Sequence, residues 1–317
     1  CFWHLNIMSE PVIVVHGGAG NIPDNRDQPK FDGILTAIRK AHATYKTTSS
    51  ITDACQAAVE YMEDEPAFNA GRGSVLNLKG EIEMEALIME GKDMKAGSVT
   101  GVRNIAHPIA LARKVMENTP HVFLMGASAN EFAEKMGFET VSDDYLMTSD
   151  ARIGLDNFFK SGSEPITTEI GHGGVGTVGA IGMDGNSGHM ISCTSTGGIT
   201  GKMAGRVGDT PVPGAGGYCD NNVGTISTTG HGDSIMRYCL AQRIMQNLEN
   251  GDTPDIAAQK ACDGMSARVG GSAGAIVISK SGEVGIGFSS PKMAWAFLKN
   301  GIIYYGIRKG EKFTVKL

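Results

Sequence analysis

The sequence predicts a fold of the α+β class, with stacked β-sheets and helices on their outer faces. Strand patterns occur in neighbouring groups rather than in strict alternation with helices. Helix patterns come in pairs that flank these groups. Glycine, at 44 of 317 residues, is about twice its usual share and gathers in motifs between strands and helices. This clustering indicates many tight turns and close approaches of the backbone.

The first half of the chain begins with a buried strand and continues with paired helices and paired strands. The β-branched run at 12–15 ends at His16-Gly17-Gly18, which is typical of a buried strand. Behind a cap at Thr52 or Asp53, apolar residues recur at helical spacing. The predicted elements are strands at 12–15, 81–88 and 98–105, and helices at 32–46, 52–64, 108–117 and 128–136.

The second half follows a polar stretch at about 139–172, in which only 150–160 has a helical pattern. The last dozen residues of this stretch are predicted to be a mobile linker. Gly185-Asn186-Ser187-Gly188 then separates two strand patterns, which predicts a hairpin. The remaining predicted elements are strands at 177–184, 189–196, 273–279 and 283–289, and helices at 233–249 and 253–268.

Composition and charge are those of an ordinary globular protein, with 41% hydrophobic and 20% charged residues. The net charge is −6 and the basic residues are scattered, so we expect no nucleic-acid partner. No apolar run approaches the roughly 18 residues that a membrane-spanning helix needs, so we expect no membrane partner.

The cysteines and the start of the chain predict a cytoplasmic protein. The six cysteines lie far apart without a Cys-x-x-Cys pair, and no Asn-x-Ser/Thr acceptor occurs, which suits a reducing compartment. Residues 1–9 are interpreted as an extension, because the start is too short and too uncharged for a signal peptide.

Three motifs suggest other chemistry and lack the context that it needs. The Gly-x-Gly-x-x-Gly match at 171–176 follows a polar linker and precedes a strand, unlike a dinucleotide-binding loop. The Gly-x-Ser-x-Gly match at 270–274 joins a helix to a strand, and no histidine follows His231, so a serine esterase is excluded. The histidines are isolated, without the spacing of metal ligands.

Thr177, in Gly176-Thr177-Val178-Gly179-Ala180, is the candidate nucleophile. A threonine hydroxyl needs a base beside it, and cleavage before the threonine would free its own α-amine for that role. Such an amine titrates at about 7.7–8.0, so part of it is neutral at physiological pH. From these five residues alone, the favoured interpretation is that Thr177 simply starts a β-strand.

Five motifs in fixed order change that balance. They are Val15-His16-Gly17-Gly18-Ala19-Gly20, Phe68-Asn69-Ala70-Gly71-x-Gly73-Ser74, Gly176-Thr177-Val178-Gly179, Ser195-Thr196-Gly197-Gly198-Ile199 leading into Arg206-Val207-Gly208-Asp209-Thr210-Pro211, and Ser227-Thr228-Thr229-Gly230-His231-Gly232-Asp233-Ser234. Together they closely resemble the plant-type, threonine-dependent L-asparaginase/isoaspartyl peptidase family of N-terminal nucleophile hydrolases, with the human-type asparaginase-like members nearest. The resemblance covers roughly residues 10–308.

The resemblance implies a four-layer αββα sandwich, made as one domain of residues 1–317 that cuts itself. The cut would fall between Gly176 and Thr177 and give an α chain of 1–176, with a mobile end at about 161–176, and a β chain of 177–317. The mature enzyme would hydrolyse L-asparagine to L-aspartate and ammonia and remove N-terminal isoaspartyl residues from dipeptides. It would require no cofactor, and two precursors would pair into a homodimer that becomes (αβ)2.

The resemblance also implies a role for each site residue. Thr177 would be the nucleophile, with its new α-amine as base, and Thr196 would hydrogen-bond and tune it. The Thr229 hydroxyl and the Gly230 N–H would be the oxyanion donors, and Asn69 would lie near the scissile bond.

Substrate binding is implied for a second set of residues. Arg206 would grip the α-carboxylate with two prongs, and Asp209, with Gly230 and the Gly232 carbonyl nearby, would hold the α-ammonium. The loop from Glu63 to Phe68 resembles one that binds a structural sodium ion through backbone carbonyls.

Plain structural roles remain alternatives for these residues. Arg206 and Asp209 could form a surface ion pair, Thr228 and Thr229 could cap the helix at 233–249, and Asn69 could be a turn residue.

Two departures from the family pattern stand out. The segment 172–176 is richer in glycine than is usual for the family, which predicts slow cleavage, and Glu85 stands where the family pattern has aspartate.

Two other functions are compatible with part of the sequence. A glycosylasparaginase acting on glycan-linked asparagine would use the same chemistry, but it is expected to carry a signal peptide, disulfides and glycosylation sites. A non-catalytic relative is disfavoured because the nucleophile, oxyanion and carboxylate-binding residues are all present.

Overall fold

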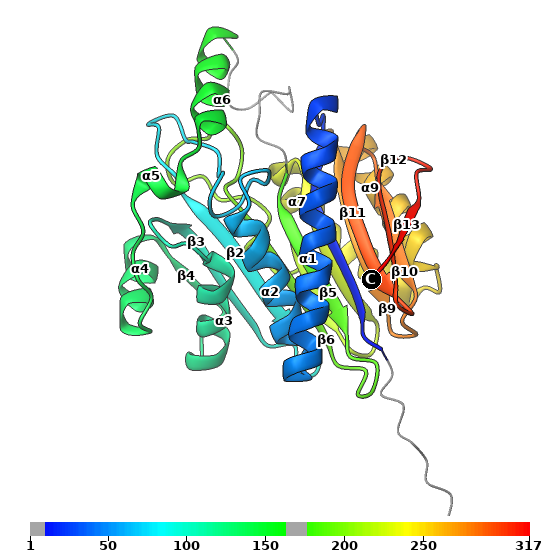
Figure 1. Ribbon diagram of the computed structural model, residues 1–317. Coiled ribbons are helices and arrows are strands. Elements are labelled where there is room, and N and C mark those ends of the chain that lie inside the picture. Colours follow the sequence, from blue (N-terminus) through cyan, green and yellow to red (C-terminus); the bar gives the residue numbers. More distant parts are fainter. Residues whose placement is uncertain (1–9, 163–175) are drawn as a thin grey trace, which may run out of the picture.

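The computed structural model describes residues 10–162 and 176–317 and combines helices with two β-sheets (Figure 1). The helices are η1 (Asp24–Arg26), α1 (Asp27–Thr48), α2 (Ile51–Asp64), α3 (Pro108–Asn118), α4 (Gly126–Lys135), α5 (Asp143–Leu146), α6 (Ser149–Lys160), α7 (Gly232–Tyr238), α8 (Leu240–Glu249) and α9 (Pro254–Val269). The strands are β1 (Val12–Gly20), β2 (Met84–Glu90), β3 (Ala96–Val102), β4 (Phe123–Met125), β5 (Val178–Met183), β6 (Met190–Thr196), β7 (Gly217–Asp220), β8 (Gly224–Gly230), β9 (Ala273–Ser279), β10 (Val284–Phe288), β11 (Lys292–Lys299), β12 (Ile302–Arg308) and β13 (Phe313–Lys316). The predicted α+β class is confirmed.

The larger sheet has nine strands in the order β13-β12-β11-β1-β5-β6-β2-β3-β4, and the smaller has four in the order β10-β9-β8-β7. Neighbouring strands are antiparallel except β3 and β4. The predicted hairpin across 185–188 is confirmed, since β5 and β6 pair from Val178↔Ser195 to Met183↔Met190. This order places β5, which follows Thr177, in the middle of the larger sheet.

The strand β1 is buried on both faces, which explains its uninterrupted apolar run. Ile13 and Val15 belong to the core shared with α1 and α2, whereas Val14 packs in a cluster with Ile276 and Ile278 of the smaller sheet. Successive side chains of a strand point to opposite faces, so both faces must be covered. Full burial of one such side chain contributes about 1.5–3 kcal/mol.

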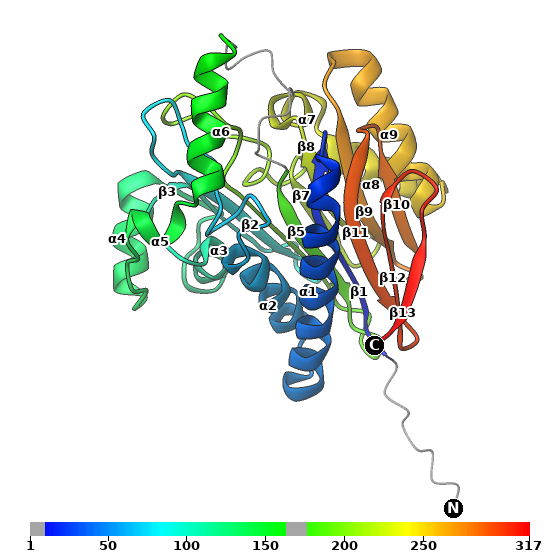
Figure 2. The same cartoon turned by 45° about the horizontal axis from the view of Figure 1, so that its top comes forward.

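Several helices pack on one face of each sheet, whereas α6 projects beyond the sheets (Figures 1 and 2). The helices α1, α2 and α3 contact strands of the larger sheet, and α8 and α9 contact the smaller one. Between the sheets, β1 contacts β9 and β6 contacts β8. The two sheets therefore pack directly against each other.

Local signals set the starts of several helices. The Ser50 hydroxyl accepts a hydrogen bond from the Asp53 N–H at 3.1 Å, so Ser50 caps α2 rather than Thr52 or Asp53. Thr148 caps α6 in the same way, accepting from the Ala151 N–H at 3.1 Å.

The predicted helix at 233–249 is wrong in one respect, because it is two helices. Cys239 has the left-handed φ of 53° and separates α7 from α8. Thr228 and Thr229 lie in β8, and the N-cap of α7 is His231, so the helix-cap alternative for these threonines is also wrong. The strands β4, β7, β8 and β11 to β13 and the short helix α5 were not predicted.

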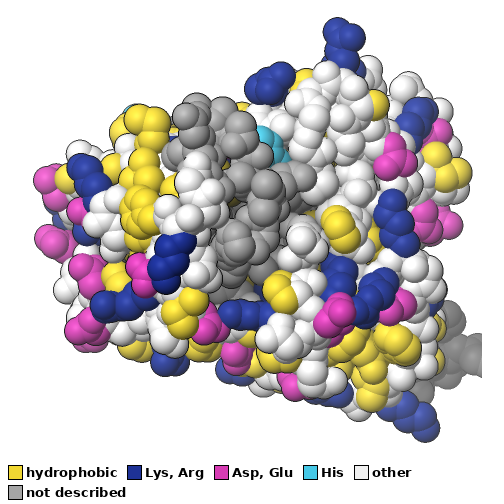
Figure 3. Space-filling view, turned by 90° about the horizontal axis from the view of Figure 1, so that it is seen from above, with side chains coloured by type: hydrophobic (Ala, Val, Ile, Leu, Met, Phe, Trp, Pro, Cys, Tyr) yellow, Lys and Arg dark blue, Asp and Glu magenta, His cyan; other side chains and the backbone are white. Residues whose placement is uncertain are grey.

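Surface and thiol properties can be compared with the expectations from composition. Within 10–162 and 176–317, no helix has both the length and the apolar character that crossing a membrane requires. On the face seen in Figure 3, basic and acidic side chains are interspersed. Cys55, Cys193, Cys219, Cys239 and Cys262 are free thiols. The predicted extension at 1–9 and most of the predicted mobile end at 161–176 lie outside the described residues.

Candidate active site

Thr177 lies at one end of three adjacent strands of the larger sheet. It directly precedes β5, whose first residue Val178 pairs with Ser195 of β6, and Glu85 of β2 pairs with Thr196. The Thr177 side chain is buried, and its Oγ1 lies 3.3 Å from the Oγ1 of Thr210. A hydroxyl in this position is shielded from bulk water.

Gly176 fits tightly against β1. It has a φ of 66°, and a Cβ at this position would overlap the backbone of Gly18 and Ala19. The pairing of β1 with β11 shifts register between His16 and Ala19, so Gly17 and Gly18 form a bulge there. Only glycine fits position 176 without strain, because it tolerates the left-handed backbone and adds no side chain.

Two buried titratable side chains flank this bulge. The Lys30 ammonium donates to the Gly17 carbonyl at 2.8 Å and lies 4.6 Å from the Phe68 ring centroid. Burial, together with the nearby charge of Arg26, lowers the pKa of Lys30 to about 7. Burial lowers the pKa of His16 to about 3, which keeps its imidazole neutral near neutral pH.

Thr229 connects β8 to the bulge of β1. Its buried Oγ1 accepts a hydrogen bond from the Ala19 N–H at 3.1 Å. Because the hydroxyl acts there as an acceptor, its own hydrogen is left to donate elsewhere. The next residue, Gly230, has a φ of 133° and packs directly on the Ser272 carbonyl. Thr229 and Gly230 therefore end β8 beside the segment that Gly176 contacts.

Asn69 and Thr196 are tied to one turn at the end of β6. The Asn69 carbonyl accepts from the Gly197 N–H at 3.0 Å, and the Asn69 Nδ2 donates to the Gly198 carbonyl at 2.7 Å. The Thr196 Oγ1 accepts from the Gly198 N–H at 3.0 Å. In the described part of the chain, the recorded hydroxyl partner of Thr177 is thus Thr210 and not Thr196.

Arg206 and Asp209 converge over Gly232, the first residue of α7. A Cβ on Gly232 would lie 2.8 Å from the Arg206 Nη2 and 2.7 Å from the Asp209 Oδ1. The Arg206 side chain is only 14% exposed, and its Nη2 donates to Asp233 at 2.6 Å. Its Nε has no partner among the described residues. A half-buried guanidinium with spare donor capacity suits a carboxylate ligand better than a surface ion pair.

Asp209 is a buried carboxyl that titrates near neutral pH. It is 3% exposed and accepts a hydrogen bond from the Thr228 hydroxyl at 3.3 Å. Burial raises its pKa to about 7, although the charge of Arg206 acts in the opposite direction. A cationic group bound beside it would favour the ionised form.

Glu85, the departure from the family pattern, holds the loop that carries Arg206 and Asp209. Its two carboxylate oxygens accept from the Gly208 N–H at 2.9 and 3.1 Å, and one accepts from the Thr100 hydroxyl at 3.3 Å. A side chain of this length thus spans from β2 to the loop backbone. Glutamate at this position therefore fixes the backbone of the loop between Arg206 and Asp209.

The loop from Glu63 to Phe68 brings carbonyl oxygens together. The carbonyl oxygens of Pro66 and Phe68 lie 3.0 and 2.7 Å from the point that a Cβ on Gly73 would occupy. The Glu63 side chain is fully buried, and its Oε1 accepts from the Ser195 hydroxyl at 2.6 Å. Burial raises the pKa of Glu63 well above its ordinary value, and its Oε2 has no partner within the described ranges.

A pocket opens beside Asn69, between this loop and α6. Across it, the Arg26 guanidinium pairs with the Asp150 carboxylate at 2.5 Å. The pocket is lined by Arg26, Pro66, Ala67, Phe68, Asn69, Gly73, Val75, Thr148, Asp150 and Ala151.

Sequence reasoning missed Thr210 and Lys30. Thr210 directly follows Asp209 in the same motif, so the motif carried a signal for it. Lys30 lies in the first half of α1, where its position in the sequence gives no sign that the side chain is buried.

Comparisons with known proteins identify the family of the chain. A family model described as asparaginase matches residues 9–307. The isoaspartyl peptidase/L-asparaginase of Xenopus laevis is 45% identical over 308 residues, which covers 97% of this chain and 98% of the relative. The proteins of the same name from Danio rerio and Mus musculus are 43% and 45% identical, over 96% of this chain in each case and over 97% and 92% of the relatives. The chain therefore belongs to the asparaginase family.

Proposed function

We propose that this protein is a self-cleaving threonine amidohydrolase that acts on L-asparagine and on β-aspartyl dipeptides. The convergence of Arg206 and Asp209 over Gly232 carries the proposal, because it offers one group for an α-carboxylate and one for an α-ammonium. Thr210 follows Asp209 and lies beside the Thr177 hydroxyl, so the same loop connects this pair to the nucleophile. The names of the relatives, isoaspartyl peptidase/L-asparaginase, support the same substrates.

Catalysis would begin when the Thr177 hydroxyl attacks the side-chain carbonyl of the substrate. Its proton would pass to the Thr177 α-amine and then to the departing ammonia or amine. The Thr229 hydroxyl and the Gly230 N–H would stabilise the oxyanion, with Asn69 beside the leaving group and Thr196 supporting the nucleophile. Water would then hydrolyse the ester and release aspartate.

The α-amine would arise by self-cleavage between Gly176 and Thr177. In that step the Thr177 Oγ1 attacks the Gly176 carbonyl, an ester forms as the C–N bond breaks, and the hydroxyl proton ends on the freed amine. Hydrolysis of the ester separates residues 1–176 from 177–317. The tightly packed Gly176 supports this step, because a residue without a side chain leaves its carbonyl open to the Thr177 hydroxyl.

We infer the architecture and environment that the family pattern implies. The two sheets with their outer helices form the αββα sandwich of an N-terminal nucleophile hydrolase, as one domain. The precursor pairs as a homodimer in the cytoplasm, and the free thiols suit that compartment. No cofactor takes part in the chemistry.

A sodium ion would fit the loop from Glu63 to Phe68, where carbonyl oxygens converge beside Gly73. Hard cations prefer oxygen ligands. The ion would fix the backbone that leads into Asn69.

Hydrolysis assays on matched isomers test the proposal. Mature protein should release aspartate from L-asparagine and from β-aspartyl-leucine but leave α-aspartyl-leucine and glutamine intact. In an α-aspartyl peptide the α-carboxylate is consumed, so Arg206 loses the second carboxylate that its unused Nε could bind, at a cost of roughly 1–3 kcal/mol. Thr177→Ala protein, prepared identically, controls for contaminating hydrolases. Equal hydrolysis of the α and β isomers would contradict the proposed binding roles of Arg206 and Asp209. Activity confined to glycan-linked asparagine would favour a glycosylasparaginase.

A further inference from the structure

Thr210 is a fully buried threonine to which the proposed chemistry assigns no role. Its hydroxyl lies 3.3 Å from the Thr177 hydroxyl. Thr210 lies in the loop between β6 and β7. The same motif in this loop begins with Arg206, the candidate for binding the substrate carboxylate. A buried hydroxyl that meets the nucleophile directly needs an explanation.

The backbone around Thr210 is held in place on both sides. On one side, Glu85 accepts from the Gly208 N–H. On the other, the Val212 N–H donates to the Asp209 carbonyl at 2.9 Å, and Gly216 packs on the Thr210 backbone, with its Cβ position 2.5 Å from the Thr210 Cα. The Thr210 hydroxyl is therefore presented from a fixed backbone, as a positioning group must be.

The other candidate hydroxyls meet backbone N–H groups and are not within hydrogen-bond distance of the Thr177 hydroxyl in the described part of the chain. Thr196 accepts from the Gly198 N–H, and Thr229 accepts from the Ala19 N–H. In the uncut chain the nitrogen of Thr177 is an amide, so the nucleophile has no amine of its own to orient its hydroxyl. Within 10–162 and 176–317, Thr210 is the residue whose side-chain hydroxyl lies beside the Thr177 hydroxyl.

We propose that Thr210 is a positioning residue for self-cleavage, which holds the Thr177 hydroxyl in the rotamer that attacks the Gly176 carbonyl. The inference rests on the proposed function. Thr210 keeps its own proton throughout, because the hydroxyl proton of Thr177 moves to the nitrogen that the cut releases. A separation of 3.3 Å is long for two hydroxyls, and such contacts tighten as the reacting groups approach.

The test compares variants that keep or lose one hydroxyl. Thr210→Val removes it with little change in shape, and Thr210→Ser retains it. Thr225→Val is the matched control, because Thr225 is also fully buried and its hydroxyl donates to the Ile191 carbonyl at 2.9 Å, away from Thr177. Uncut precursor from cell-free synthesis is incubated, and conversion to two chains is followed on denaturing gels.

The Thr210→Val precursor should mature at least about tenfold more slowly than wild type, because a misplaced nucleophile loses its attack geometry. Thr210→Ser and Thr225→Val should mature within about threefold of wild type, and Thr225→Val should match Thr210→Val in thermal stability. If Thr210→Val does not fold, Thr210→Ala against Thr210→Ser makes the same comparison.

The outcomes separate this inference from the proposed function. Maturation of Thr210→Val at the wild-type rate, or of Thr210→Ser as slowly as Thr210→Val, overturns the positioning role while self-cleavage stands. A wild-type precursor that stays at full length overturns both.

Discussion

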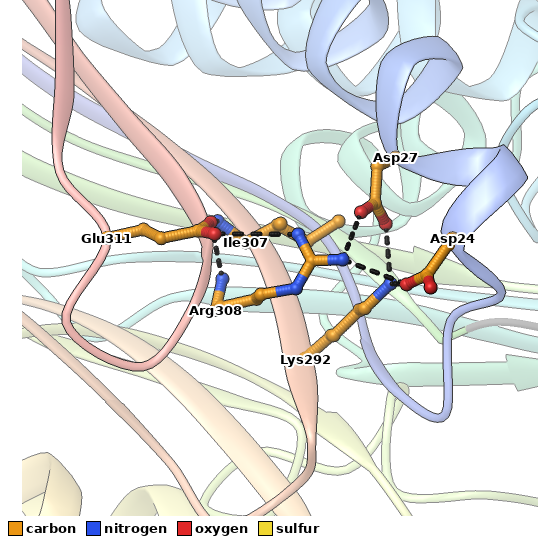
Figure 4. Close-up of polar contacts among 6 residues, drawn as sticks. All are labelled: Asp24, Asp27, Lys292, Ile307, Arg308 and Glu311. Carbon is orange, nitrogen blue, oxygen red and sulfur yellow. Dashed lines mark hydrogen bonds and ion pairs between the residues drawn. The ribbon is translucent and has the colours of Figure 1, made fainter.

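Two polar clusters lie near the same end of β1 and differ in how completely their groups are paired. The first, the Thr177 cluster, comprises Thr177, Thr210, Thr229, Arg206 and Asp209. The second, the Arg308 cluster, comprises Asp24, Asp27, Lys292, Arg308 and Glu311 (Figure 4). In the pairing of β1 with β11, Lys292 lies opposite Gly20, one residue beyond the Ala19 that donates to Thr229.

The Arg308 cluster is saturated with ion pairs. Lys292 donates to Asp24 at 2.6 Å and to Asp27 at 2.8 Å, and Arg308 donates to the same two carboxylates at 2.8 and 2.6 Å. Arg308 also pairs with Glu311 at 3.4 Å. The Asp24 side chain is 87% exposed, so part of this cluster meets solvent.

The Thr177 cluster is mostly buried and keeps unused hydrogen-bonding capacity, such as the Arg206 Nε, which has no partner among residues 10–162 and 176–317. Saturated charges at a surface hold segments together, here the start of α1 and the strands β11 and β12. Buried polar groups whose hydrogen bonds are unsatisfied lower stability unless a ligand bonds to them. On the proposed function, the Thr177 cluster serves binding and chemistry, and the Arg308 cluster serves stability.

The sharpest test of the contrast is Thr229→Ala. It should lower kcat by roughly 10²–10³ with little change in KM, because an oxyanion donor acts mainly on the transition state. Steady-state kinetics with L-asparagine measures this, and Thr229→Ser, which keeps the hydroxyl, is the matched control. A raised KM at unchanged kcat would reassign Thr229 to ground-state binding.

A smaller effect is expected for Arg206→Lys. The charge remains, but the two-pronged contact is lost, so kcat/KM should fall by on the order of a hundredfold. Arg237→Lys, an exposed arginine in α7, should leave kcat/KM unchanged. Full activity of Arg206→Lys would show that a point charge suffices.

The pH dependence of kcat/KM should reveal Asp209. Burial raises its pKa to about 7, and its ionised form is needed to hold a substrate ammonium. On the acid side, log(kcat/KM) should fall by about two for each pH unit, because Asp209 and the α-amine must each lose a proton. In Asp209→Asn the residual slope should be about one. An unchanged slope would remove Asp209 from the binding step.

The raised pKa of Asp209 favours activity at high pH but stability of the folded chain at low pH. The Asp209 carboxyl keeps its proton in the folded chain up to about pH 7, whereas the unfolded chain loses it near the ordinary value of 3.8. The contribution of Asp209 to stability is therefore present at low pH and is lost as pH rises through about 7. Urea unfolding of wild type against Asp209→Asn across this range measures it.

The smallest effect on activity is expected in the Arg308 cluster. Lys292→Met should lower the free energy of unfolding by roughly 1 kcal/mol, less at high salt, and leave kcat/KM unchanged. Lys299→Met is the control, since Lys299 lies on the same strand and its amine meets the Gly282 carbonyl rather than a carboxylate. Loss of activity in Lys292→Met with stability intact would break the division between the two clusters.

Elements with strong local patterns could be predicted from the sequence, and some unpredicted ones carried a usable signal. The hairpin of β11 and β12 turns at Asn300-Gly301, both with positive φ (53° and 73°), and Asn-Gly between apolar runs predicts such a hairpin. In contrast, β8 is rich in threonine and glycine and buried between β7 and β9, so it shows no apolar run. The break at Cys239 interrupts a helical pattern that continues in the sequence.

For the Thr177 cluster, the ordered motifs in the sequence predicted most of the residues but not the contacts between them. The pairs Glu85–Gly208 and Thr177–Thr210 join segments far apart in sequence. Such pairs follow from the order of strands in the larger sheet, which local patterns do not encode. The length of Glu85 became meaningful only once its reach to the Gly208 N–H was known.

The central claim is that Thr177 becomes an N-terminal nucleophile, and intact mass with N-terminal sequencing tests it most directly. Purified wild-type protein, incubated to completion and denatured, should give two chains, the second beginning at Thr177, together with aspartate release from L-asparagine. Thr177→Ala should stay as one chain and release none. A wild-type chain that remains intact yet hydrolyses asparagine, or a second chain that begins elsewhere, would contradict the account.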